Sequence, residues 1–118
     1  MSERAPHTLA AAPYETRPGR FAARVQSDTP AGCRVALLGL PDDLGVLLNG
    51  GRPGAQRGPS AFRAALARFG VPWDGLRDRA LALSVFDAGD IEPAPGASAL
   101  ALAETHARVL DAVAWLHE

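Results

Sequence analysis

Residues 35–41 of this 118-residue chain read Val35-Ala36-Leu37-Leu38-Gly39-Leu40-Pro41, and this stretch decides the fold class. Its first six residues are apolar without interruption, and the proline ends the run. Such a run is typical of a β-strand that is buried on both faces, as in parallel sheets. A buried helix is the alternative, but a helix needs roughly 10 or more residues. The run therefore predicts a β-strand over residues 35–40.

A helix, a second strand and a second helix are expected after this strand. The first helix starts at Gly58-Pro59, and its apolar face consists of Phe62, Ala65, Leu66 and Phe69. The second strand covers residues 81–87 and closes with Asp87-Ala88-Gly89-Asp90-Ile91, and a helix then runs from the N-cap Ser98 to the end of the chain. The apolar face of that helix is expected at Leu102, His106, Val109, Leu110, Val113 and Leu116. Its outer side carries the pair Glu104 and Arg108. This alternation predicts an α/β fold with a parallel sheet.

The residues before the first strand form a separate region. Residues 1–32 contain four prolines among small and polar residues. This composition predicts a loosely ordered, flexible N-terminal arm with one short helix near residues 20–25. The α/β domain is expected over residues 33–118.

Composition excludes several classes of protein. The net charge is −1 and the twelve basic residues, all arginine, are scattered, so we expect no nucleic-acid partner. No segment has the roughly 18 apolar residues of a membrane helix, and the N-terminus does not resemble a signal or transit peptide. We therefore expect no membrane partner and a cytoplasmic location. The single cysteine, Cys33, cannot form an internal disulfide.

Carboxylates follow both predicted strands, where α/β folds place ligand sites. Such side chains can bind a metal or transfer protons, but loop aspartates more often cap helices and stabilise turns. Both roles stay open at each position, with the structural role favoured. The candidates are Asp42, Asp43, Asp87, Asp90 and Glu92. The glycine-rich connection over residues 41–58 has neither a P-loop nor a dinucleotide-binding pattern, which leaves a nucleotide-binding module as a weak alternative.

The same connection resembles the N-terminal segment of the ureohydrolases, the family of arginase, agmatinase and formimidoylglutamase. The resemblance covers residues 34–118, and its Asn-Gly-Gly-Arg form is most similar to formimidoylglutamase. It is carried by Leu38-Gly39-Leu40-Pro41-Asp42-Asp43-Leu44-Gly45, by residues 49–63, by Asp87-Ala88-Gly89-Asp90-Ile91 and by the last helix around Glu104-Thr105-His106-Ala107-Arg108.

The resemblance implies a three-layer α/β/α fold, of which this chain is the N-terminal βαβα part. Family members hydrolyse guanidino or formimino C–N bonds with two manganese ions; for formimidoylglutamase the substrate is N-formimidoyl-glutamate, in histidine degradation. The family's metal ligands lie in Gly-Gly-Gly-His, Asp-Ala-His-x-Asp and Asp-x-Asp segments, and none of these occurs here. We therefore assign no catalytic residue, metal ligand or cofactor to this chain, and expect it to be inactive unless a C-terminal part completes it.

The resemblance also gives a small set of residues non-catalytic roles. Asn49 and Arg52 are expected on the rim of the substrate pocket, while Gly54 and Gly58 let the backbone turn tightly into the first helix. Arg63 is expected to form an ion pair with Asp87 or Asp90, which ties that helix to the end of the second strand.

Two readings of the whole chain remain. In the first it is the N-terminal portion of a formimidoylglutamase-like enzyme, made as a short chain by truncation, a frameshift or gene splitting. In the second it is a non-enzymatic interaction module or subunit, which pairs with itself or with a complementary chain through an exposed strand edge.

Overall fold

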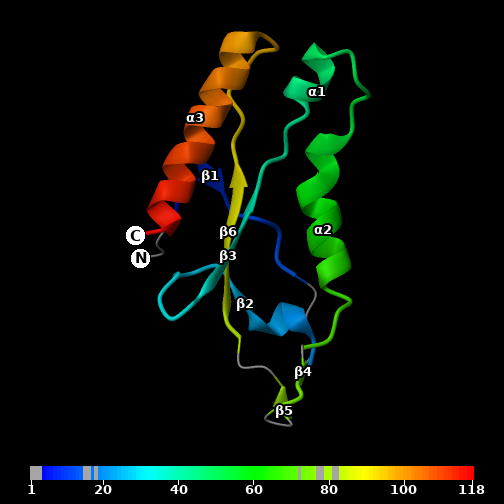
Figure 1. The fold of residues 1–118 in the computed structure, drawn as a ribbon, viewed down its shortest axis with the longest axis vertical. Coiled ribbons are helices and arrows are strands. Elements are labelled where there is room, and N and C mark those ends of the chain that lie inside the picture. The colour runs from blue at the N-terminus through cyan, green and yellow to red at the C-terminus, as the bar shows by residue number, and fades with distance from the viewer. Residues whose placement is uncertain (1–3, 15–16, 18, 72, 77–78, 81–82) are drawn as a thin grey trace.

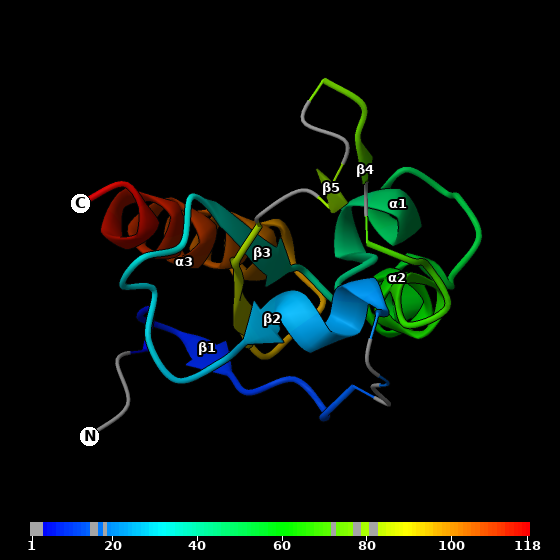
Figure 2. The same ribbon diagram turned by 90° about the horizontal axis from the view of Figure 1, so that it is seen from below.

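A computed structural model describes residues 4–14, 17, 19–71, 73–76, 79–80 and 83–118. A small mixed sheet lies in the middle, with helix α3 (Ala99–Leu116) on one face and helices α1 (Leu44–Leu48) and α2 (Gly58–Leu66) on the other (Figures 1 and 2). This arrangement is the α/β fold that the sequence predicts. Among the described residues, none of the helices combines the length and apolar character that a membrane span requires.

Strand β6 (Val85–Ile91) is the centre of the sheet. Strand β3 (Val35–Gly39) runs parallel along one edge of β6, with Val35 opposite Val85. The other edge holds β2 (Val25–Gln26), which is parallel to β6, and β1 (Thr8–Leu9), which is antiparallel. Among the described residues, β6 is the only strand that pairs with β3. The expectation that residues 35–40 are buried on both faces is wrong, since Val35 is 43% exposed.

The N-terminal segment supplies more secondary structure than its composition indicates. The short 3-10 helix η1 (Phe21–Arg24) lies where a helix was expected, near residues 20–25. Strands β1 and β2 were not expected, because strands of two residues are too short to show an apolar period. Ala5, which precedes β1, is 2% exposed and belongs to the hydrophobic core.

The position of β6 also corrects the sequence analysis. The strand was expected over residues 81–87, but it begins at Val85 and continues to Ile91; residues 81 and 82 lie outside the described part of the chain. It contains a bulge, because Leu37 pairs with Asp87 whereas Gly39 pairs with Asp90. Between these two pairs, β6 advances by three residues and β3 by two, so β6 has one extra residue.

The core lies between β6 and α3. Phe86 and the indole of Trp115 are in contact, with ring centroids 6.4 Å apart. Ser98 caps α3 as predicted, since its Oγ accepts a hydrogen bond from the Ala101 N–H at 3.2 Å. The predicted pair of Glu104 and Arg108 also forms, at 3.5 Å. The core cluster consists of Ala5, Phe86, Ala88, Ile91 and Ala112, with Cys33, Leu38, Val109, Trp115 and Leu116 packed around it.

The predicted apolar face of α3 is partly wrong. The buried residues are small: Ala101, Thr105 and Ala112. Leu110 is 69% exposed and His106 is also exposed, although both were placed on the buried face. Small side chains let the helix approach the sheet closely, so the face that packs is rotated from the one with the largest apolar residues.

The predicted apolar face of α2 is wrong for a different reason. No residue of α2 is buried, Phe62 is 56% exposed, and Phe69, which follows the helix, is 62% exposed. The side chain that α2 turns toward the sheet is Arg63. The remaining elements are the 3-10 turn η2 (Ala55–Arg57) before α2 and the hairpin of β4 (Trp73–Asp74) and β5 (Arg79–Ala80).

Candidate functional site

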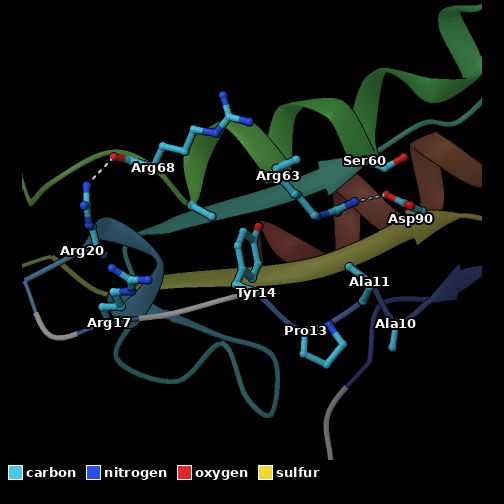
Figure 3. A pocket seen from close by; sticks show the side chains of 13 residues that line it. Ala10, Ala11, Pro13, Tyr14, Arg17, Arg20, Ser60, Arg63, Arg68 and Asp90 are labelled. Atoms are coloured by element: carbon cyan, nitrogen blue, oxygen red, sulfur yellow. Dashed lines mark hydrogen bonds and ion pairs between the residues drawn. The ribbon is translucent and has the colours of Figure 1, made fainter.

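The site begins with Arg63 of α2, which reaches across to β6. Its Nε and Nη2 donate to the two oxygens of Asp87 at 2.8 and 3.0 Å. Its Nη1 donates to Asp90 Oδ1 at 2.7 Å (Figure 3). Its Nη2 also donates to the Gly89 carbonyl at 3.1 Å. The sequence analysis expected Arg63 to pair with Asp87 or Asp90, and in the structure it contacts both. The two-pronged contact with Asp87 is the strong, planar form of an arginine–carboxylate pair.

The bulge in β6 explains how one arginine reaches two aspartates. Successive side chains of a strand point to opposite faces, so residues three apart normally face opposite ways. Phe86 and Ala88 pack toward α3, whereas Asp87 points to α2. The bulge at Gly89, whose φ is 83°, turns Asp90 to the α2 face as well.

Two glycines make room for this arrangement. A Cβ on Gly89 would meet the carbonyl oxygen of Leu9 in β1, and positive φ already disfavours other residues there. A Cβ on Gly39 would meet Asp90 Oδ1 and Pro59 Cβ. The backbone of β3 therefore approaches the ion-paired carboxylate closely.

Asp87 is the most enclosed member of the cluster. Its side chain is 0% exposed, compared with 11% for Arg63 and 27% for Asp90. Besides Arg63 it accepts hydrogen bonds from the Tyr14 hydroxyl at 2.7 Å and from the Gly89 N–H at 2.9 Å. These partners satisfy both oxygens of the buried carboxylate, so burial leaves no lone charge.

The cluster shifts the pKa values of its members. Burial alone raises the pKa of the Asp87 carboxyl, but the hydrogen bonds from Arg63, Tyr14 and Gly89 outweigh it and hold that pKa below its usual value. Burial, together with the hydrogen bond to Asp87, raises the pKa of the Tyr14 hydroxyl. Burial opposes the charge on Arg63, yet the two aspartates raise its pKa. All three groups therefore keep one protonation state at neutral pH.

This chemistry suits a structural cluster better than a catalytic one. A general base needs a free lone pair near a substrate, and both oxygens of Asp87 are engaged. Among the described residues, no group of three or more His, Cys, Asp or Glu side chains is placed to hold a metal ion. The cluster instead fastens α2 to the carboxyl half of β6.

The other carboxylates lie apart from this cluster. Asp43 is buried, precedes α1, and accepts a hydrogen bond from the Gly54 N–H at 2.9 Å through its Oδ2. Asp43 thereby closes part of the glycine-rich connection, which is the structural role weighed for loop aspartates. Glu92 is exposed, and its backbone carbonyl accepts a hydrogen bond from Arg108 at 2.7 Å. Asp42 is half-buried.

The glycine-rich connection holds the other residues singled out in the sequence. Asn49 and Arg52 are both exposed, and their role on a substrate-pocket rim stays a prediction. Gly54 has a φ of 136°, which only glycine adopts readily, so a tight turn is present there. Gly58 has helical φ and ψ, and a Cβ on it would meet no atom within 4 Å. Its backbone therefore does not need glycine.

Sequence reasoning missed Tyr14 and the bulge. Tyr14 lies 73 residues from Asp87 along the chain, in a segment without periodic pattern, so no local signal points to the contact. A signal for the bulge does exist, since Asp87-Ala88-Gly89-Asp90 places glycine between two aspartates three residues apart.

Comparison with known proteins gives a consistent result. The model of the arginase family matches residues 33–116. The formimidoylglutamase of Hahella chejuensis is 46% identical over 67 residues, which are 57% of this chain and 18% of that protein. That of Geobacillus thermodenitrificans is 46% identical over 68 residues, 58% of this chain and 19% of that protein. That of Streptococcus gordonii is 43% identical over 61 residues, which are 52% of this chain and 17% of that protein.

The matched region is thus a small part of each relative. The chain spans less than a fifth of the length of these curated proteins. No solved structure matches it.

Proposed function

Because this chain belongs to the arginase family, we propose that it forms the N-terminal part of a hydrolase of the formimidoylglutamase type. The proposed reaction of that whole hydrolase is manganese-dependent cleavage of the formimino C–N bond of N-formimidoyl-glutamate, in histidine degradation. The similarity to three formimidoylglutamases supports this choice within the family.

The observation that carries the proposal is the cluster of Arg63, Asp87 and Asp90. It joins a helix to the carboxyl half of a central parallel strand, the part of an α/β sheet beside which ligand sites form. A rigid attachment there positions the neighbouring loops. The proposed contribution of this chain is therefore to support an active site rather than to perform the chemistry.

The described residues do not fit a pair of manganese ions. Asp87 and Asp90, which lie in the part of β6 that resembles the family, are bound to Arg63. The family's three ligand segments do not occur in the sequence. No step of the reaction is therefore assigned to a residue of this chain. We propose that the 118 residues alone do not hydrolyse N-formimidoyl-glutamate, and that the metal ligands belong to a further part of the hydrolase.

A chimera tests the proposal. In the Hahella chejuensis formimidoylglutamase, the 67 aligned residues are replaced by those of this chain, and hydrolysis of N-formimidoyl-glutamate is measured with manganese present. We expect the chimera to be active and the 118-residue chain to be inactive, with the unaltered relative as control. A soluble, folded chimera without activity would contradict the scaffold role. Activity of the 118-residue chain by itself would contradict the proposal that the metal ligands belong to a further part of the hydrolase.

The exposed edge of β3 supports a second candidate function. Val35 is 43% exposed and Leu40, which follows the strand, is 37% exposed; among the described residues this strand has only β6 as a partner. Unpaired edges of apolar strands recruit other strands. The chain is then an interaction module that pairs with a second copy of itself.

Sedimentation velocity distinguishes this candidate. Pairing through β3 predicts a dimer that dissociates when Val35→Lys places a charge on the edge. The matched control is Leu110→Lys, on the exposed side of α3. A monomer at high concentration would count against the interaction module and leave the hydrolase proposal intact.

A further inference from the structure

We propose that the cavity between the N-terminal segment and α2 binds a small aliphatic organic acid. The cavity has a volume of about 710 Å³ and lies between residues 10–14 and the side of α2 that carries Ser60, Arg63 and Ala64 (Figure 3). Cavities that hold small molecules commonly measure roughly 300–1,000 Å³. This proposal concerns a site of its own and does not depend on the hydrolase assignment.

The two ends of the cavity differ in charge. Figure 3 shows Arg17 and Arg20 at one end and the pair of Arg63 and Asp90 at the other, with the Tyr14 ring between them. Asp87 and Asp90 carry two negative charges against the one positive charge of Arg63, so that end has no excess positive charge. Asp90 is the only carboxylate among the described lining residues, so the Arg17 and Arg20 end carries the excess positive charge. That end therefore favours an anionic group.

Arg20 is held in place at this end. Its Nη1 donates to the carbonyl oxygen of Arg68, just beyond the end of α2, at 2.7 Å. A guanidinium has five N–H donors in a rigid plane, so this bond orients the group and leaves other donors for a ligand. Planar arginine forks match the geometry of carboxylate oxygens. A carboxylate between Arg17 and Arg20 gains both charge and directed hydrogen bonds.

The wall of the cavity indicates that the ligand is organic. Small apolar side chains line it from both sides, those of Ala10, Ala11 and Pro13 from the N-terminal segment and those of Ala64 and Ala67 from the α2 side. An inorganic anion at the arginines would leave this wall without contact. A short methylene chain fills it and removes apolar surface from water. The combination of an arginine end and an alanine-rich wall therefore selects an acid with an aliphatic body.

An NMR titration of the 118-residue chain with pentanoate, a short aliphatic monocarboxylate, tests the proposal. We expect saturable shifts of the backbone amides of residues 10–12, 14, 17, 20 and 60–68, with other amides unchanged. Arg17→Gln should weaken binding about tenfold, which is about 1.4 kcal/mol, since it removes a charge-assisted hydrogen bond to the carboxylate. The matched control is Arg57→Gln, an exposed arginine that does not line the cavity, which should bind as the parent chain does.

A second variant tests the apolar wall without changing any charge. Ala64 is exposed on α2, so Ala64→Leu is compatible with the helix and places a larger side chain in the cavity. It should weaken binding of pentanoate and leave any binding of inorganic phosphate unchanged. The amide spectrum away from the cavity confirms that each variant is folded.

Three results would overturn the proposal. The first is the absence of saturable shifts with pentanoate in the folded chain. The second is equal affinity in Arg17→Gln and Arg57→Gln, which would remove the arginine end from the site. The third is binding of inorganic phosphate as tight as that of pentanoate, which would leave an adventitious ion only.

Discussion

On one face of β6, α3 packs through apolar and small side chains, whereas on the other face α2 is attached through an ion-paired arginine. The first contact is a hydrophobic core around Phe86, Ala112 and Trp115. The second is an ion-paired cluster in which Arg63 binds Asp87 and Asp90, while Phe62 of the same helix stays exposed. The same strand thus holds its two helices by different forces.

The difference shows how one strand can carry apolar side chains on one face and charged side chains on the other. Alternation puts Phe86 and Ala88 on the α3 face and Asp87 on the α2 face. The bulge at Gly89 then adds Asp90 to the polar side. Apolar burial is non-directional, but the arginine contact requires a particular orientation of α2. The polar face therefore specifies where α2 lies, and the apolar face holds the hydrophobic core.

The largest effect should come from the apolar face. Phe86 is 1% exposed, and Phe86→Ala should lower the free energy of unfolding by about 4 kcal/mol through lost burial and a cavity. Urea unfolding followed by circular dichroism measures the change. An exposed apolar residue provides the control, because Leu110→Ala should change stability by less than about 0.5 kcal/mol. Equal losses of stability in Phe86→Ala and Leu110→Ala would mean that no hydrophobic core forms between β6 and α3.

Removal of Arg63 from the polar face should lower the free energy of unfolding by less than Phe86→Ala does. Arg63→Ala leaves the buried Asp87 carboxylate without its cation and should cost about 3 kcal/mol in the same unfolding experiment. Arg57→Ala removes an exposed arginine just before the same helix and should be almost neutral. A loss for Arg63→Ala no larger than that for Arg57→Ala would make the cluster energetically irrelevant.

The bulge can be tested by itself. Gly89→Ala forces a side chain into positive φ against the Leu9 carbonyl and should cost about 2 kcal/mol. Gly58→Ala is the matched control, since its backbone is helical and open; it should stabilise the chain by about 0.5–1 kcal/mol. Changes in the free energy of unfolding that have the same sign in the two variants would contradict the assigned role of Gly89.

The smallest effect should come from Tyr14. Tyr14→Phe removes one hydrogen bond to Asp87 and should cost about 1 kcal/mol at pH 7. Since the pKa of Asp87 is lower in the folded chain, its contribution is complete above the unfolded pKa of about 3.9 and is lost as pH falls through the folded value. Without the hydroxyl the folded pKa rises, so Tyr14→Phe should lose this stability at a higher pH. Unfolding measured across pH 2–7 checks this, and superimposable pH profiles for the two chains would refute it.

The sequence predicts the elements that have strong local signals. Ser98 begins α3 because its side chain can accept from the helix N-terminus, and the Gly58-Pro59 step begins α2. Arg63 was also expected to form an ion pair with Asp87 or Asp90, and in the structure it contacts both.

What the sequence missed depends on contacts between distant segments. Periodicity favoured Phe62 on the buried side of α2, but buried carboxylates on β6 require a cation, and Arg63 takes that side instead. The last two residues of β6, Asp90 and Ile91, pair with β1, whose two residues show no pattern. The Tyr14 contact spans 73 residues. Each miss is a case in which tertiary partners override a local preference.

A double-mutant cycle of Arg63→Met and Asp87→Asn tests most directly whether the polar face of β6 holds α2 through this pair. The free energy of unfolding is measured by urea denaturation for the parent chain, both single variants and the double variant. Our account predicts that the double variant is less destabilised than the sum of the single variants by about 2 kcal/mol or more. Losses that add to within about 0.5 kcal/mol would contradict it, because they would show that the two side chains do not depend on each other.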